Sequence, residues 1–249
     1  MRLILILFIA ILNLPSAHAA SSSVAEDIPV SAYEVRNWER RAEKRDSDYD
    51  FQLIQLKKSN IDYFRSGIKS LRNLYSFTSY YEPFSDRLID EMTRYAYTVQ
   101  NSKDTMKVNS SLEAYKELVD KHIANITVLN FAITMARVNA LFGNPAYYER
   151  AREAVYEGIT AGADGNRPQT AYHIVVRDEE LMILARQGYE IEKSEVYDVN
   201  GAYYNVYDVR DKNGEFDQIF MNITRPVKVS YIKKYLARKQ QTYTIPGME

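Results

Sequence analysis

The spacing of the apolar residues changes period once along this chain, and that change is the strongest constraint on its fold. Between residues 51 and 159 apolar residues recur every three or four positions, which predicts helices. Beyond Gly188 they alternate with polar residues, which predicts strands over 189–199, 203–209 and 216–223. The sequence therefore predicts an α+β fold: an antiparallel helical-hairpin body followed by a small, mainly antiparallel β-sheet with one or two helices.

Turn and capping residues divide these periodic runs into elements. Gly, Asn and Pro at 143–145 predict the end of one helix and the start of the next, and Pro83 and Pro226 are predicted to open helices. Three acidic residues at 178–180 predict a helix start, because the positive end of a helix dipole favours carboxylates. Asn-Gly at 200–201 predicts a two-residue hairpin turn. Short connections between helices predict antiparallel neighbours.

The turn at 141–144 and the alanine-spaced helix after it resemble half of a tetratricopeptide unit. No second copy follows at a period of about 34 residues, so a repeat-like helical bundle is expected and a true repeat array is not. The predicted parts are a signal peptide (1–19), a linker with an N-terminal helix or arm (20–50), the helical body (51–160), an α+β subdomain (161–240) and a tail (241–249).

The N-terminal residues are typical of a secretory signal peptide. Arg2 precedes an apolar run from Leu3 to Leu14, and small residues at Ala17 and Ala19 favour cleavage between Ala19 and Ala20. The alternative is an uncleaved membrane anchor, but a run of about 12 residues is shorter than the roughly 20 that a spanning helix needs. A soluble protein exported to the periplasm or secreted is therefore expected.

Composition excludes several classes of chemistry. The chain has no Cys, which rules out disulfides, thiol nucleophiles and cysteine-based metal sites. Its 32 basic and 33 acidic side chains create no large positive field, so no nucleic-acid partner is expected. The 21 tyrosines suit half-buried helix faces and wet binding grooves equally well.

Several short motifs together resemble a known family. They are Ile61-Asp62-Tyr63, Leu71-Arg72 with Tyr75, Tyr80 and Pro83, the Gly-Asn helix turn, Asp164-Gly165, Thr170-Ala171-Tyr172, Glu179-Glu180, Tyr197-Asp198, and Phe220 with Asn222. In this order they are similar to an uncharacterised family of exported bacterial proteins catalogued as a domain of unknown function (4919-like), over roughly residues 62–236. The family loop usually reads Ser-Gly-Asp-Gly, whereas this chain has Gly-Ala-Asp-Gly, and Leu181 replaces a Tyr that commonly follows the acidic pair. The resemblance supports the predicted fold, and it implies no particular activity because the family has none established.

Asp164, His173, Glu179 and Glu180 are the candidates for catalytic acid-base chemistry or metal binding, since carboxylates and imidazole transfer protons near neutral pH. For each a structural role is the alternative: Asp164 in a tight turn and the two glutamates at a helix start. The sequence has none of the common zinc, nucleophile-elbow or phosphate-loop motifs, and no cofactor or metal is expected.

Candidate ligand-binding residues are Gly165, Tyr172, Tyr197 and Asp198. The leading hypothesis is a binding or scaffolding module of the cell envelope, whose tyrosine-rich hairpins present a groove to another envelope protein. The alternative is an envelope hydrolase with carboxylates at the junction of body and sheet. The two differ in whether Asp164, His173, Glu179, Glu180 and Asp198 converge in one pocket.

Membrane contact is expected to be peripheral at most. The residues considered for it are Lys233, Lys234, Arg238 and Lys239, with a solvated helix face as the other interpretation. The oligomeric state stays open.

Overall fold

The computed structural model describes residues 31–58 and 61–243. The predicted signal peptide with its cleavage site at Ala19–Ala20, the linker and the last residues of the tail lie outside these ranges. The elements are α2 (Ala32–Lys58), α3 (Ile61–Tyr75), α4 (Asp86–Asn101), α5 (Thr105–Lys121), α6 (Ile126–Val138), α7 (Pro145–Thr160), the short 3-10 helix η2 (Pro168–Thr170), β1 (Tyr172–His173), α8 (Asp178–Gln187), β2 (Glu190–Val199), β3 (Ala202–Arg210), β4 (Phe216–Asn222) and α9 (Thr224–Tyr243).

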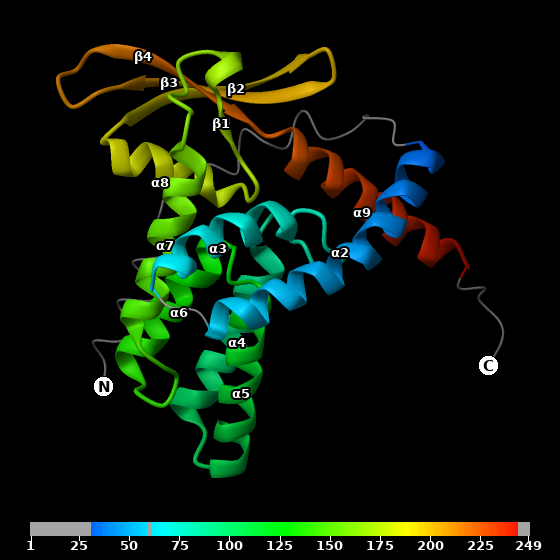
Figure 1. The fold of residues 1–249 in the computed structure, drawn as a ribbon, viewed down its shortest axis with the longest axis vertical. Helices are drawn as coiled ribbons and strands as arrows, with labels where there is room; N and C mark the ends of the chain where they lie inside the picture. The colour runs from blue at the N-terminus through cyan, green and yellow to red at the C-terminus, as the bar shows by residue number, and fades with distance from the viewer. Residues whose placement is uncertain (1–30, 59–60, 244–249) are drawn as a thin grey trace.

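The helical body is built from antiparallel hairpins, as predicted. Helices α4 and α5 form one pair and α6 and α7 another, while α3 packs against α7 and α2 against α3. Asp104, Asn125 and Asn144 begin α5, α6 and α7 by accepting backbone N–H groups at the first turn. Figure 1 shows the sheet above this body, with α8 between them and α9 crossing back toward α2.

Two predicted helix starts were wrong by two or three residues. Helix α4 begins at Asp86 rather than Pro83: residues 76–80 form turns, residues 81–85 are irregular, and the backbone hydrogen bond that opens the helix runs from the Ile89 N–H to the Ser85 carbonyl. Helix α9 begins at Thr224 rather than Pro226, since the Asn222 side chain accepts the Thr224 N–H and so caps the helix earlier. Pro83 lies three residues before the first residue of α4, and Pro226 lies within the first turn of α9.

The sheet has four strands in the order β1-β4-β3-β2. Asn200 (φ 54°) and Gly201 (φ 79°) make the predicted two-residue turn between antiparallel β2 and β3. Strand β3 is also antiparallel to β4, whereas β1 is parallel to β4. The predicted run 171–176 gives only a two-residue strand, because the Val175 N–H turns away and donates to the Glu179 carboxylate.

The tyrosines of the body lie mainly in its core. Tyr49, Tyr75, Tyr81 and Tyr115 are fully buried, and their rings contact other aromatic rings at centroid distances of 5.0–6.4 Å. The Tyr49 hydroxyl donates to the Lys121 carbonyl at 3.1 Å, which ties α2 to the end of α5. These four side chains stabilise the packed interior and do not line a groove. Among the described helices, none is long and apolar enough to cross a membrane.

Candidate functional site

The first turn of α8 lies between the helical body and the sheet (Figure 1). Its adjacent carboxylates, Glu179 and Glu180, are 0% and 1% exposed, although carboxylates are rarely buried without partners. Consecutive residues of a helix start point about 100° apart. The two glutamates therefore reach different neighbours, Glu179 toward α3 and Glu180 toward β3.

Glu179 forms a buried, bidentate ion pair with Arg72 of α3. Arg72 Nε donates to Glu179 Oε1 at 2.8 Å and Arg72 Nη2 to Oε2 at 2.7 Å. The Arg72 Nη2 also donates to the His173 carbonyl at 2.5 Å, and the Val175 N–H donates to Glu179 Oε2 at 2.7 Å. These hydrogen bonds satisfy both charges, so the pair fastens α3, β1 and α8 together.

Glu180 is held by the inner face of the sheet. Its Oε2 accepts from Asn205 Nδ2 at 2.7 Å and from the Tyr207 hydroxyl at 2.8 Å. Arg177 Nε lies 2.8 Å from Glu180 Oε1, although no hydrogen bond of good geometry reaches that oxygen from any described residue. Burial raises the pKa of Glu180, and the positive charge of Arg177 counteracts part of that rise. Thus the acidic pair joins α8 to the body on one side and to β3 on the other.

The loop before β1 is built around Asp164 and Gly165. Asp164 is exposed, and its Oδ1 accepts the Thr170 hydroxyl at 2.5 Å and the Asn166 N–H at 3.0 Å. These hydrogen bonds lower the pKa of Asp164. The Gly165 carbonyl accepts the Phe220 N–H of β4 at 2.7 Å. The loop is thereby anchored to itself and to the sheet.

Gly165 is expected to tolerate no side chain, and Gly162 in the same loop supplies a matched control. Both have similar positive φ angles, +76° and +77°, so alanine is strained at either position. A Cβ at Gly165 would lie 2.5 Å from Tyr172 Cε2, whereas a Cβ at Gly162 meets nothing within 4 Å. Gly165→Ala should therefore lower the free energy of unfolding by roughly 1–3 kcal/mol more than Gly162→Ala. Urea denaturation measures the difference, and equal losses would show that the close approach to Tyr172 is unimportant.

The other candidates occupy separate places. The Tyr172 side chain is buried and its hydroxyl accepts from Gln187 Nε2 at 2.7 Å. Tyr197 is half-exposed on β2, and Asp198 accepts the Gly201 N–H at 2.7 Å and so stabilises the hairpin turn. The His173 side chain retains solvent contact; partial desolvation and the charges of Arg72 and Arg225 lower its pKa.

The five residues whose convergence in one pocket would favour a hydrolase are thus distributed over several clusters. Glu179 and the His173 backbone share Arg72, Glu180 belongs to the β3 cluster, and Asp164 and Asp198 each hold their own turn. Across residues 31–58 and 61–243 no group of three or more His, Asp or Glu side chains is placed to hold a metal ion.

Sequence reasoning did not assign the partners of the acidic pair. Arg72, Asn205 and Tyr207 are all at most 4% exposed, and each bonds to a buried glutamate. One signal was available: Arg72 interrupts an apolar helix face that includes Ile68 and Leu71, where a charged side chain needs a buried partner.

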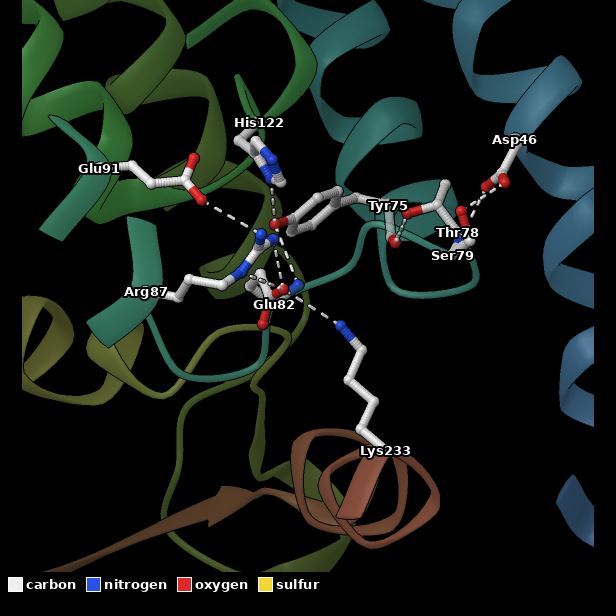
Figure 2. Close-up of polar contacts among 9 residues, drawn as sticks. All are labelled: Asp46, Tyr75, Thr78, Ser79, Glu82, Arg87, Glu91, His122 and Lys233. Atoms are coloured by element: carbon white, nitrogen blue, oxygen red, sulfur yellow. Dashed lines mark hydrogen bonds and ion pairs between the residues drawn. The ribbon is translucent and has the colours of Figure 1, made fainter. Parts of the chain in front are cut away.

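A second polar cluster surrounds His122 at the end of α5 (Figure 2). His122 Nδ1 lies 2.8 Å from the Tyr75 hydroxyl, whose oxygen accepts the Glu82 N–H at 3.2 Å. The Glu82 carboxylate in turn accepts Arg87 Nη2 at 2.7 Å and lies 3.3 Å from Lys233 Nζ. Burial, aided by the charges of Arg87 and nearby lysines, lowers the pKa of His122 to about 3. The imidazole is consequently neutral at physiological pH.

Together these features define an α+β protein in which a buried acidic pair fixes a helical body to a four-stranded mixed sheet. The chain belongs to the family described as Domain of unknown function (DUF4919), whose model matches residues 39–231. That match confirms the resemblance found in the sequence and includes Arg72, Glu179 and Glu180. No curated protein and no solved structure matches the chain.

Proposed function

We propose that this protein is an exported binding module of the cell envelope, which recognises an extended, basic segment of a partner protein at the edge of its sheet. The observation that carries this proposal is the free, partly apolar edge strand β2. The N-terminal residues support export, since they have the charged, apolar and small-residue parts of a signal peptide.

Strand β2 is the last strand in the sheet order, so one of its backbone edges has no strand partner among the described residues. Its first half carries a register irregularity between Ile191 and Lys193, which weakens that half as a template for pairing. The second half, 194–199, pairs regularly with β3. This half is the part of the edge suited to adding another strand.

The outer face of the sheet adds apolar surface beside that edge. Tyr197 and Val199 are each 47% exposed and stand opposite Tyr204 and Ala202 of β3. Inward-facing neighbours on β3, such as Tyr203 and Asn205, are buried instead. Since alternate residues of a strand face opposite sides, these four residues share the outward face, Tyr197 and Val199 exposed and Ala202 and Tyr204 partly exposed; we call them the β2 strip.

The charge of β2 favours a basic partner. Its ten residues include four carboxylates and one lysine. The ion pairs of Lys193 with Glu195 and of Arg210 with Glu192 leave Glu190 and Asp198 without a basic partner among the described residues. A segment that alternates basic and apolar residues matches both the carboxylates and the β2 strip.

The structure gives no comparable support for an envelope hydrolase. Glu179 and Glu180 are engaged by Arg72 and by Asn205 and Tyr207, and Asp164 is engaged by its own loop. Each of these contacts has a structural role. We therefore propose binding and do not propose catalysis.

A peptide of alternating lysine and valine tests the proposal. It should bind the protein, and a peptide of alternating glutamate and valine should not, as measured by fluorescence anisotropy. Tyr197→Ser should weaken binding by about tenfold, because an aromatic anchor is lost from the β2 strip. Tyr97→Ser on α4 is the matched control, since Tyr97 is 69% exposed on another element.

The protein for this experiment is recovered from the periplasm of a Gram-negative host that expresses the full chain, and its N-terminus is sequenced. We expect recovery there with Ala20 as the first residue. Retention in the cytoplasm would contradict export. Equal binding of both peptides, or dimerisation through β2 that Tyr197→Ser abolishes, would contradict recognition of a basic partner.

A further inference from the structure

The helical hairpins point their turns away from the sheet. The Pro83 carbonyl, just before α4, accepts the Arg177 N–H at the N-cap of α8. The Thr127 hydroxyl, in the first turn of α6, donates to the Asp178 carboxylate of α8. Helices α4 and α6 therefore begin beside α8, close to the sheet. Their antiparallel partners α5 and α7 return toward it, so the α4–α5 and α6–α7 turns lie at the far end of the body, as Figure 1 shows.

These two turns carry the most exposed apolar side chains of the four helices. Met106, in the first turn of α5, is 83% exposed, and Tyr97, near the end of α4, is 69% exposed. Leu141, between α6 and α7, is 73% exposed. Such side chains contribute little to the packed core. Because three of them gather at one end of the molecule, we infer that this end contacts an apolar phase or partner.

The charge of the two turns indicates which contact this is. The α4–α5 turn, residues 97–110, contains Lys103 and Lys107. Both lysines are exposed, and neither forms an ion pair with a described residue. Asp104 is the single carboxylate of this turn, and it caps α5. Residues 138–148, around the α6–α7 turn, have no charged side chain. An anionic surface would therefore meet two unpaired lysines and almost no opposing carboxylate.

We propose that the α4–α5 and α6–α7 turns bind the surface of an anionic lipid bilayer. Met106 and Leu141 enter the boundary between headgroups and acyl chains, and the amphipathic ring of Tyr97 lies at the headgroup level. Lys103 and Lys107 contact the lipid phosphates. The acidic strand β2 then points away from the membrane, because the sheet is at the opposite end of the molecule. This surface is independent of the β2 strip and of the partner proposed for it.

Cosedimentation of the exported protein with lipid vesicles tests the proposal. Vesicles of phosphatidylglycerol and phosphatidylcholine should bind it about tenfold more tightly than pure phosphatidylcholine, and added salt should reduce this difference. Met106→Ser combined with Leu141→Ser should weaken binding by about tenfold, because two apolar side chains no longer enter the bilayer. Lys103→Gln combined with Lys107→Gln should have an effect of about the same size on the anionic vesicles.

Phe216→Ser and Lys212→Gln are the matched controls, since both side chains are exposed on the β3–β4 hairpin of the sheet. They should leave vesicle binding unchanged, and the variants of the two turns should leave peptide binding at β2 unchanged. Circular dichroism checks that each variant is folded. Binding to anionic vesicles that only the turn variants weaken supports the proposal. No binding, equal binding to neutral vesicles, or equal effects of the turn and sheet variants would overturn it.

Discussion

Replacing Arg72 by methionine is expected to lower the free energy of unfolding by about 3–5 kcal/mol, the largest effect that we predict for a single substitution. Arg72 and Glu179 are 3% and 0% exposed and share two hydrogen bonds. Removing the arginine leaves a buried carboxylate with the Val175 N–H as its remaining donor. Urea denaturation followed by circular dichroism measures the loss.

Two further variants test the physical reason. Arg72→Met combined with Glu179→Leu should be more stable than Arg72→Met alone, because the unpaired buried charge is then absent. Arg137→Met is the surface control, since the Arg137–Glu149 pair is 62% and 36% exposed, and it should cost less than about 1 kcal/mol. If Arg72→Met costs no more than Arg137→Met, the buried pair does not hold the body to α8.

Acidification from pH 7 to pH 4 is expected to remove about 3 kcal/mol of stability through His122 alone. The pKa of this imidazole is about 3 in the folded protein, against an ordinary value of 6.5. In the unfolded chain His122 therefore binds a proton below about pH 6.5, whereas in the folded protein it binds one only below about pH 3. The contribution of His122 to the free energy of unfolding is fully present above pH 6.5. It falls as the pH decreases between these two values, by about 1.4 kcal/mol per pH unit.

His122→Asn separates this effect from the titration of other groups. Asparagine retains an acceptor for the Tyr75 hydroxyl but does not titrate. The variant should be less stable than the parent at pH 7, and its stability should change less between pH 7 and pH 4. Unfolding free energies at both pH values measure the contrast. Parallel pH dependence in the two proteins would show that His122 does not cause the acid sensitivity.

Most of the candidate site could be recognised from the sequence only as a set of residue types. The sequence marks Glu179 and Glu180 as an acidic pair, and their predicted place at a helix start is confirmed. Their partners were not identified, because Arg72 is 107 residues from Glu179, while Asn205 and Tyr207 are 25 and 27 residues from Glu180. Local pattern carries no information on contacts at such separations.

The tyrosines illustrate the same limit. The 21 tyrosines are compatible with a packed core or with a binding groove, and composition does not distinguish these two roles. Tyr49 lies in a strongly charged stretch, yet it is fully buried against α3 and the end of α5. One apolar position every three or four residues is enough to bury a helix face, whatever the charges between them.

The sequence by itself determined the order and type of the elements, the Asn200-Gly201 hairpin and the helix turn at 143–145. Each of these depends on residues within a few positions of one another, through helix and strand periods and the backbone freedom of Gly and Asn. Only the tertiary structure decided which buried groups neutralise one another, as Arg72 and Glu179 do, and that β1 is parallel to β4. Those outcomes depend on how distant segments pack, because burial turns a charge that is harmless in solvent into one that requires a specific partner.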